Sequence, residues 1–478
     1  MISMAFLVFL ASACLYCIAS GRHFWGLLLC IGFSQDMVRK LTPGEPIIFI
    51  VTVGVLFGAI LVAIVARRGL SYVSEPYFRW SGTLQAPVIL FIVILVLQFF
   101  HSLVRYGNPV VGLIGLVTYI APFLGVIVGY YLVQSVEDIR RLTGAYIALG
   151  LVVATTVVMS FMGYDWAVLR EIGQGIRIYD QGTVLRSYSG VMRSGEIAAW
   201  HISMAACLIV TLAVSSKNFS TYAIVIALVV FMMVAVTLTG RRKMLMLFSL
   251  YMLSYVTVYF YYRKSLDRRY FFTIFYLALL GWFTFEVVNL GTYNESLSNY
   301  IARGSSVFGD ASGRFVELGI KPVQWAYNRV GLFGGGLGIA SQGGYLFNVS
   351  DVAGGSGEGG LGKIMVELGL PGLICLMWLG IAGARYLNNA LQLANQKFAS
   401  PELLPLMTSL SVILGVNAIT FSVATQVYGD VFVLVVLGTL AGCLLALPKI
   451  VARQVQERQL QTVVFRALQD RPSGLTAS

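Results

Sequence analysis

The chain has 478 residues, of which 58% are hydrophobic and only 11% are charged, and its mean hydropathy is +0.81. Because an ordinary soluble domain carries about 25% charged residues, this composition excludes soluble, disordered, collagen-like and disulfide-scaffold proteins. It predicts an integral membrane protein. The formal charge is +12. Because most basic residues sit between apolar runs, membrane topology is the first explanation for this charge, and contact with anionic lipid head groups or pyrophosphate is the second. Both are favoured over nucleic-acid binding.

Apolar stretches follow one another along the chain and predict an all-α polytopic membrane protein with about 12–13 transmembrane helices. The first stretch lacks a basic leader and a cleavage site, so we expect a retained span rather than a signal peptide. The second is short and leaves the parity of the helix count open. The stretches are 2–20, 23–38, 46–65, 84–104, 110–133, 142–161, 196–215, 221–238, 244–262, 270–290, 361–384, 403–424 and 429–448.

Basic clusters between the stretches orient the helices, because the side rich in Lys and Arg is cytoplasmic. Arg39-Lys40 fits this alternation poorly if 23–38 is a full span. The tail, about 449–471, alternates apolar and basic residues, which fits a helix on the inner leaflet and a solvated tail equally. The orienting clusters are Arg67-Arg68, Arg140-Arg141, the run 263–269, Arg385 with Lys397, and the tail from Lys449.

Two long loops, 162–195 and 291–360, then fall on the outer side. Long loops without secondary structure are uncommon unless they are functional or disordered. We expect the glycine-dense part from Gly331 to Gly362 to be a flexible lid, with a mobile linker as the alternative. The expected divisions are 1–161 and 162–290 (transmembrane helices, the second with the first outer loop and an arginine-rich turn), 291–360 (large periplasmic loop), 361–448 (C-terminal transmembrane helices) and 449–478 (cytoplasmic tail).

The residues best suited to chemistry form the run Thr239-Gly240-Arg241-Arg242-Lys243. Its three cations lie between two apolar stretches, on the side where the orientation rule disfavours positive charge. Charges near membrane depth are usually functional, and arginine forms bidentate bonds to phosphate oxygens. A clamp for a lipid-linked phosphate or pyrophosphate is therefore favoured over snorkelling residues at a helix end or an inverted topology.

This run resembles the Thr-x-Ser-Arg signature of the O-antigen ligase and polymerase (Wzy/WaaL-like) superfamily, multi-span glycosyltransferases of bacterial surface polysaccharides. Four further segments resemble elements of that family in the same order, so the resemblance covers roughly residues 180–385. They are Arg186-Ser187-Tyr188-Ser189-Gly190 (Arg-x-x-Gly), Ser312-Gly313-Arg314 (Ser-Gly-Arg), Gly336-Leu337-Gly338 (Gly-x-Gly), and Glu358 to Gly372, EGGLGKIMVELGLPG (ending Glu-Leu-Gly-Leu-x-Gly).

The chain also departs from the family pattern. Arg241 stands in place of the family's serine, so Arg241 and Arg242 are both candidates for its arginine, with Arg242 slightly favoured. Ligases of the family often have a histidine nine residues before the Glu of Glu-Leu-Gly, which is Glu367 here. That position is Glu358, and no histidine lies in the large outer loop. These departures favour a polymerase over a lipopolysaccharide ligase.

The resemblance implies a glycan donor on undecaprenyl pyrophosphate and a transfer that needs no metal and no cofactor. Cations aimed at the leaving pyrophosphate stabilise its growing charge, and a base can take the proton of the acceptor hydroxyl. Glu358 is the candidate base, followed by Asp351 or Glu196, while a loop ion pair or a helix N-terminal charge are its structural alternatives. Arg241 and Arg242 are the candidate catalytic cations, and the candidate pyrophosphate ligands are Arg186, Arg241, Arg242 and Arg314.

Other polar residues favour structural roles. The six cysteines lie in apolar runs and indicate neither a disulfide nor a zinc site, and the three histidines share no metal-ligand spacing. His201 is expected to be hydrogen-bonded, with a place in an outer cavity as the alternative. Glu367 is expected to pair within the bundle, and Trp166 and Trp200 to lie in the interfacial aromatic belt.

Together these patterns predict a polysaccharide polymerase of the bacterial inner membrane. It would move a glycan from the lipid pyrophosphate to a sugar hydroxyl of a lipid-linked acceptor on the periplasmic side. Membrane lipids and other polysaccharide assembly proteins are the remaining expected partners. The enzyme alternative is a ligase that delivers a finished glycan to lipid A core or protein. A lipid-linked glycan flippase is the alternative of another class, and it should show related halves and interrupted helices.

Overall fold

A computed structural model describes the chain except residues 22, 79–81, 173–175, 181–182, 215–218, 264–297, 305–312, 314, 342–343, 345–346, 348–358, 396–401 and 470–478. It is an all-α polytopic membrane protein. Among the described residues, ten helices are long and apolar enough to cross a membrane.

The first half of the chain is a series of long helices. In order, its elements are α1 (Ile2–Ser20), α2 (Phe24–Leu41), η1 (Ile47–Val51), α3 (Thr52–Arg68), α4 (Ser71–Phe78), α5 (Gly82–Tyr106), α6 (Pro109–Leu132), α7 (Val136–Phe161) and η2 (Ala167–Leu169).

The second half begins with the only strand pair that the described residues form, an antiparallel hairpin in which Arg177 faces Arg186. Its elements are β1 (Arg177–Asp180), β2 (Thr183–Arg186), α8 (Gly195–Val214), α9 (Phe219–Leu238), α10 (Arg242–Arg263), the π-helical turn η3 (Val316–Ile320), α14 (Lys321–Val330), α16 (Gly360–Ala394), α17 (Leu403–Val423), η4 (Val427–Gly429) and α18 (Val431–Gln469).

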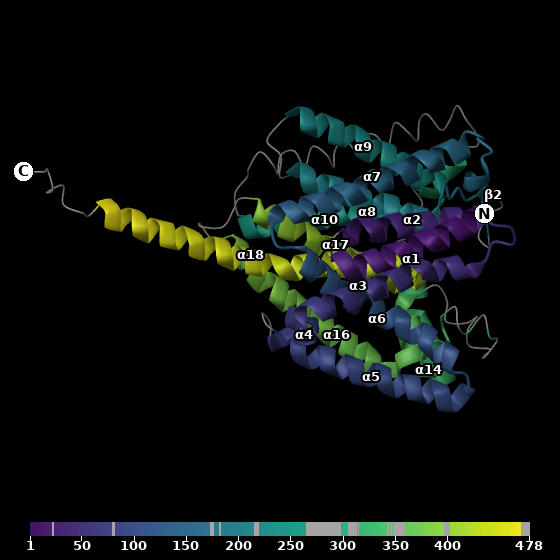
Figure 1. Ribbon diagram of the computed structural model, residues 1–478. Coiled ribbons are helices and arrows are strands. Elements are labelled where there is room, and N and C mark those ends of the chain that lie inside the picture. Colours follow the sequence, from purple (N-terminus) through teal and green to yellow (C-terminus); the bar gives the residue numbers. More distant parts are fainter. Residues whose placement is uncertain are drawn as a thin grey trace, which may run out of the picture.

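Every predicted apolar stretch is a helix in this structure except 270–290, which lies outside the described residues. The long helices run nearly parallel to one another (Figure 1). We call the end of the bundle that carries β1 and β2 the hairpin end, and the end beyond which α18 projects the tail end. The N-terminus lies near β2 at the hairpin end (Figure 1).

The described basic clusters at Arg67, Arg140 and Lys449 gather at the tail end, on one side as predicted, whereas residues 264–269 and Lys397 lie outside the described residues. Arg67 Nη2 donates to the carbonyl of Ile18 at 2.8 Å, and Arg140 pairs with Glu402 at 2.6 Å across α7 and α17. Lys449 lies 5.5 Å from the ring centre of Tyr130. These contacts join the end of α3 to the end of α1, the start of α7 to the N-cap of α17, and the middle of α18 to the end of α6.

Helix α2 explains the misfit of Arg39-Lys40. It packs along α1 and α3 as a full-length helix (Figure 1), so its last turn lies at the hairpin end. Lys40 is 3% exposed there and donates to the carbonyl of Gly190 at 2.6 Å and to Ser189 Oγ at 3.2 Å. The positive charge is thus held by the segment after β2 rather than by lipid.

Small residues allow α6 and α18 to pack backbone against backbone. Gly125 and Gly129 are four residues apart on α6, and so are Gly438 and Gly442 on α18. A Cβ at Gly129 would lie 2.0 Å from the carbonyl oxygen of Thr439, and one at Gly442 would lie 2.1 Å from a carbonyl oxygen of α6. Lipid tails are as apolar as leucine, so such close packing is what holds membrane helices together.

The glycine-dense segment is not a free lid where it is described. From Gly331 to Ser341 it packs between α5 and α16: Gln98 Nε2 donates to the carbonyl of Phe333 at 2.7 Å, and the N–H of Gly335 donates to a carbonyl of α16 at 2.7 Å. Gly338 has φ +89°, and a Cβ there would lie 1.9 Å from an α6 carbonyl oxygen. The prediction of a flexible lid is therefore wrong for this part, because long-range contacts fix the glycines.

The expectation for one of the two tryptophans needs correction. Trp200 is fully buried and donates through Nε1 to Asn417 Oδ1 at 2.9 Å, so it is a core residue and not part of an interfacial belt, whereas Trp166 is exposed. The tail is helical as far as Gln469, and α18 projects past the other helices (Figure 1), while the choice between a helix on the inner leaflet and a solvated tail stays a prediction.

Candidate functional site

The arginine-rich turn joins α9 to α10 at the hairpin end. Gly240 closes α9 with φ +70°, a left-handed conformation that glycine adopts without strain. Thr239 Oγ1 then accepts a hydrogen bond from the N–H of Arg241 at 3.2 Å. Helix α10 begins at Arg242, so consecutive cations stand at a helix N-terminus, where the macrodipole favours anions.

Neighbouring segments hold this turn in place. Ser187, directly after β2, donates through Oγ to the carbonyl of Thr239 at 2.9 Å. A side chain at Gly240 would meet Ile178 of β1 at 2.7 Å, so the hairpin packs directly on the turn. Arg303 donates through Nε to the carbonyl of Gly240 at 3.0 Å. Residues from both predicted outer loops therefore converge on the turn.

The turn forms one wall of a polar pocket of about 160 Å³, which we call the cation pocket. Four of its lining side chains are basic and one is a carboxylate. The N-termini of α8 and α10 both contribute lining residues, so two helix dipoles add to the positive potential. The lining residues are Glu196, Gly240, Arg241, Arg242, Lys243, Met244, Arg303 and Gln426.

This arrangement is suited to a compact anion with several oxygens. Guanidinium groups can form bidentate bonds with phosphate oxygens, and the low-dielectric surroundings strengthen each interaction relative to bulk water. Glu196 opens α8 and is 8% exposed. A carboxylate in the same pocket is within the region where a bound hydroxyl would need a proton acceptor.

Arg186 lies close by but does not line the cation pocket. Its Nε and Nη2 both lie 2.6 Å from Glu171 Oε2, and its carbonyl accepts a hydrogen bond from Tyr300 at 2.6 Å. The hydrogen bond that Arg186 donates to Glu171 raises the pKa of Arg186 above its ordinary value, so the guanidinium stays protonated. In this structure Arg186 is committed to an ion pair beside the site.

The remaining sequence candidates divide into two groups. Arg314, Glu358 and Asp351 lie outside the described residues, so their predicted roles stay predictions. Arg303 and Gln426, which no motif singled out, line the cation pocket. Each comes from a segment more than 50 residues away from the arginine-rich turn in sequence, so only the fold places them there.

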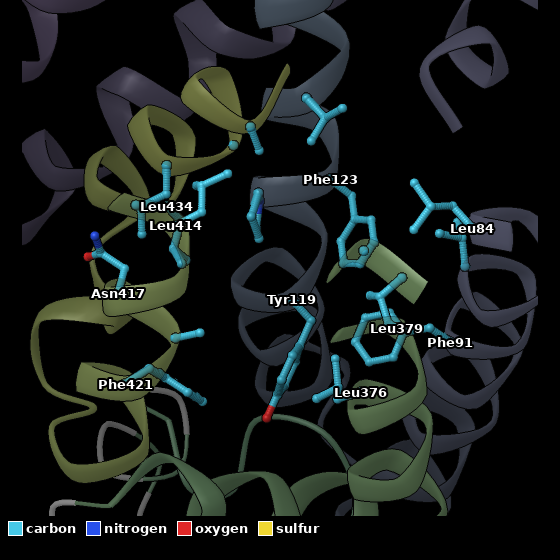
Figure 2. A pocket seen from close by; sticks show the side chains of 18 of the residues that line it. Leu84, Phe91, Tyr119, Phe123, Leu376, Leu379, Leu414, Asn417, Phe421 and Leu434 are labelled. Carbon is cyan, nitrogen blue, oxygen red and sulfur yellow. The ribbon is translucent and has the colours of Figure 1, made fainter. Parts of the chain in front are cut away.

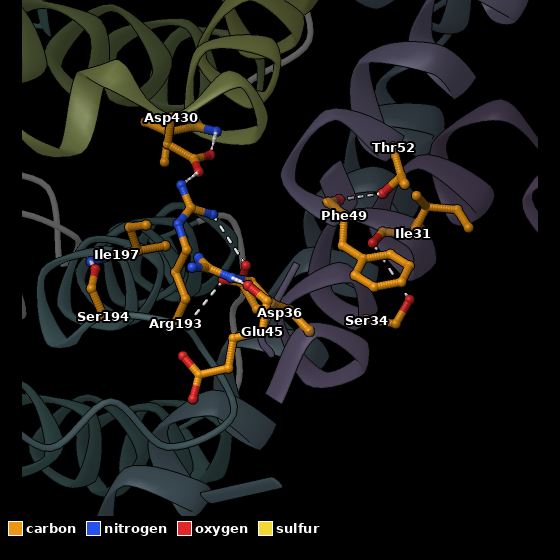
Figure 3. Close-up of polar contacts among 12 residues, drawn as sticks. Ile31, Ser34, Asp36, Glu45, Phe49, Thr52, Arg193, Ser194, Ile197 and Asp430 are labelled. Carbon is orange, nitrogen blue, oxygen red and sulfur yellow. Dashed lines mark hydrogen bonds and ion pairs between the residues drawn. The ribbon is translucent and has the colours of Figure 1, made fainter. Parts of the chain in front are cut away.

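A buried ion cluster fixes the hairpin end beside the pocket. Arg193 Nη1 contacts Asp36 Oδ1 at 3.1 Å and its Nη2 contacts Asp430, while its N–H donates to Asp36 Oδ2 at 3.0 Å. Figure 3 shows the Arg193 side chain reaching from the start of α8 to Asp36 of α2 on one side and Asp430 on the other. The cluster ties α2, α8 and α18 together.

The electrostatics of the cluster favour a permanent charge on Arg193. Burial alone would lower its pKa, but the Asp430 and Asp36 carboxylates outweigh burial and raise the pKa above the ordinary value. Asp430 Oδ1 also accepts the N–H of Val433 at 2.9 Å and so caps α18. Arg193 is thus a structural cation, and no sequence motif singled it out.

Two buried polar residues have the structural roles that the sequence favoured. His201 is fully buried, and its Nδ1 lies 2.7 Å from the hydroxyl of Tyr146. Glu367 is fully buried, and its Oε1 accepts the N–H of Ala340 at 3.1 Å. The hydrogen bond between Glu367 and Ala340 connects the Glu-Leu-Gly segment that begins at Glu367 with the segment that follows Gly336-Leu337-Gly338. No group of three or more metal-binding side chains occurs among the described residues.

The comparison with known proteins adds no relative from which function can be read. Neither the protein-family models nor the curated proteins contain a match to this chain. The functional argument therefore rests on the geometry of the cation pocket.

Proposed function

We propose that the chain is a polysaccharide polymerase of the bacterial inner membrane, with the hairpin end on the periplasmic side. It transfers a glycan from an undecaprenyl-pyrophosphate donor to a sugar hydroxyl of a lipid-linked acceptor. The observation that carries this proposal is the cation pocket, in which Arg241, Arg242, Lys243 and Arg303 surround one small space at the end of a membrane bundle. Ionisable side chains gathered in this way in a membrane protein mark a candidate functional site.

The pocket suits a reaction whose charge develops on pyrophosphate. The bond between the anomeric carbon and the pyrophosphate oxygen breaks, and a bond from that carbon to the acceptor oxygen forms. The leaving group takes the electron pair, and cations already in place stabilise it without reorganisation. Among these, Arg242 stands at the first turn of α10, so the helix dipole acts on the same anion.

The acceptor hydroxyl must lose its proton as the new bond forms. Glu196 lines the cation pocket and is the described carboxylate best placed to receive that proton. Glu358, the base that the sequence favoured, remains the second candidate for this role. Changing each to glutamine distinguishes the two candidates, because replacing the residue that acts as the base should lower the rate by about 10²–10⁴-fold.

A flippase is the second candidate, because α16 is interrupted. Gly369 has φ +68° and ψ −170° within the helix, and interrupted helices are typical of transporter binding sites. The gap is filled by protein: the N–H of Leu370 donates to the carbonyl of Leu332 at 2.9 Å. This filling favours the transferase. A ligase would use the same pocket and differ in its acceptor.

The proposal is tested by deleting the gene and analysing lipid-linked glycans on each membrane face. A polymerase predicts single repeat units on the outer face and no long chains. Complementation with Arg242→Ala should leave synthesis lowered by about 10²–10³-fold, the typical cost of one such donor. Arg170→Ala is the matched control, because Arg170 is an exposed hairpin-end arginine that pairs with Glu45 at 3.4 Å, away from the pocket.

Other glycan profiles would contradict the assignment. Long lipid-linked chains that never reach their acceptor indicate a ligase, and repeat units held on the cytoplasmic face indicate a flippase. Full synthesis by an Arg241→Ala/Arg242→Ala variant made at normal levels refutes the clamp.

A further inference from the structure

A second, very different cavity lies within the membrane-spanning part of the bundle. It has a volume of about 470 Å³ and is lined almost entirely by apolar and aromatic side chains of α5, α6, α16, α17 and α18. Figure 2 shows Leu414 and Leu434 on one side of it, and Leu84, Phe91 and Leu379 on the other. A cavity of this size and lining is typical of a site for a hydrophobic ligand.

The cavity is elongated along the helices. Its lining on α18 extends from Leu434 to Leu445, which corresponds to about 16 Å at 1.5 Å per residue. On α16 it extends from Lys363 to Leu387. Its long axis therefore follows the direction in which a lipid chain lies in a bilayer.

Among the described residues that line the cavity, one is charged, and it lies at the hairpin end. Lys363 is 7% exposed, and its Nζ lies 6.0 Å from the ring centre of Tyr119. Glu367, one turn further along α16, interacts electrostatically with Lys363 and does not line the cavity. A cation at one end and hydrocarbon along the rest match an anionic lipid with its head at the hairpin end.

The cavity ends beside the cation pocket. Phe421 lines the cavity and Gln426 lines the pocket, and only four residues separate them in sequence. At this end Asn417 and Tyr428 line the cavity, and Asn417 Oδ1 accepts hydrogen bonds from Trp200 Nε1 at 2.9 Å and from the Tyr428 hydroxyl at 3.0 Å.

We propose that this cavity binds the isoprenoid chain of a polyprenyl pyrophosphate, with Lys363 nearest the head group. The identity of the head group rests on the proposed function. A chain moving from lipid into the cavity leaves one apolar medium for another, so transfer itself contributes little. Selectivity must come from shape, and rings such as Phe91, Tyr119 and Phe421 form a firm wall for a stiff, methyl-branched chain.

The chain offers a clean test on one helix. Gly383 lines the cavity and a Cβ there meets nothing within 4 Å, so Gly383→Leu fills the cavity without clashing with the backbone. Gly380 is also on α16 with open space at its Cβ, but it is exposed and does not line the cavity. Gly380→Leu is therefore the matched control, and Ala441→Phe fills the cavity from α18 as a second variant.

The measurement is native mass spectrometry of the purified full chain titrated with undecaprenyl pyrophosphate or with phosphatidylglycerol. We expect Gly383→Leu and Ala441→Phe to weaken binding of undecaprenyl pyrophosphate at least about tenfold, while Gly380→Leu binds as the wild type does. Melting temperatures of the variants show that each is folded.

The outcomes separate this inference from the proposed function. Unchanged binding in both filled variants would refute the cavity as the chain site, and equally tight, equally sensitive binding of phosphatidylglycerol would make it a phospholipid site. If the filled variants lose binding but gene deletion leaves surface glycans unchanged, the lipid site stands and the polymerase proposal falls.

Discussion

Replacing Arg193 with methionine tests how the hairpin end is held together. Methionine keeps most of the side-chain length and removes the charge. The change leaves Asp36 and Asp430 facing one another without their shared cation. Their side chains are only 1% and 2% exposed, and that of Arg193 is 10% exposed. Water cannot replace the lost partner, so the effect should be far larger than for a surface pair.

The size of the effect follows from this burial. Removing one member of a buried ion cluster costs about 3–5 kcal/mol, because it leaves an uncompensated charge. At about 2 °C or more per kcal/mol, the melting temperature in detergent should fall by at least about 6 °C. Combining Arg193→Met with Asp36→Asn and Asp430→Asn removes the three charges of this cluster, and an asparagine can still accept the N–H that caps α18. The triple variant should recover at least half of the loss.

Thermal unfolding of the purified variants, followed by intrinsic fluorescence, measures both effects. As a control, Arg170→Ala removes an exposed arginine at the same end and should shift the melting temperature by no more than an exposed ion pair is worth, about 1 kcal/mol or less. If Arg193→Met alone is as stable as the wild type, the reasoning is refuted. A triple variant less stable than the single one would show that the charges themselves are not the cause.

Two further predictions concern packing and buried hydrogen bonds. Gly438→Ala places a Cβ 2.1 Å from an α6 carbonyl oxygen and should cost about 1–3 kcal/mol, whereas Gly415→Ala, in open space on α17, should raise stability by up to about 1 kcal/mol. Asn417→Leu leaves the donors of Trp200 and Tyr428 without their acceptor, which should lower the free energy of unfolding by about 1–3 kcal/mol for each donor. Trp200→Phe should lower it by less. Equal melting temperatures within either pair would contradict these arguments.

The membrane architecture could be predicted from sequence because it depends on local composition. Runs of about 20 apolar residues must be helical in a bilayer, since every backbone polar group has to be satisfied internally. Helix α2 was the weakest prediction because it carries Gln35, Asp36 and Lys40, all buried. Partners of these residues, such as Arg193 and Gly190, lie about 150 residues further along the chain. No local sequence pattern predicts these contacts.

Only the part of the candidate site that has a local sequence signal could be predicted. The arginine-rich turn stood out because three consecutive cations interrupt apolar sequence, and it does line a pocket. Arg303 and Gln426 could not be found, since each is an ordinary polar residue until the fold places it. The segment around Gly338 suggested mobility by composition alone, whereas its positive φ and close approach to α6 show that glycine is needed there for packing.

The most direct test of the central claim is chain extension by the purified protein in vesicles supplied with lipid-pyrophosphate-linked repeat units. The account predicts that the wild type joins units into longer lipid-linked chains without added metal or nucleotide. It predicts that Arg241→Ala/Arg242→Ala, folded and present at equal amounts, extends them at least about 10²-fold more slowly. Equal rates for the two proteins would contradict the assignment of the cation pocket as the site that stabilises the leaving pyrophosphate.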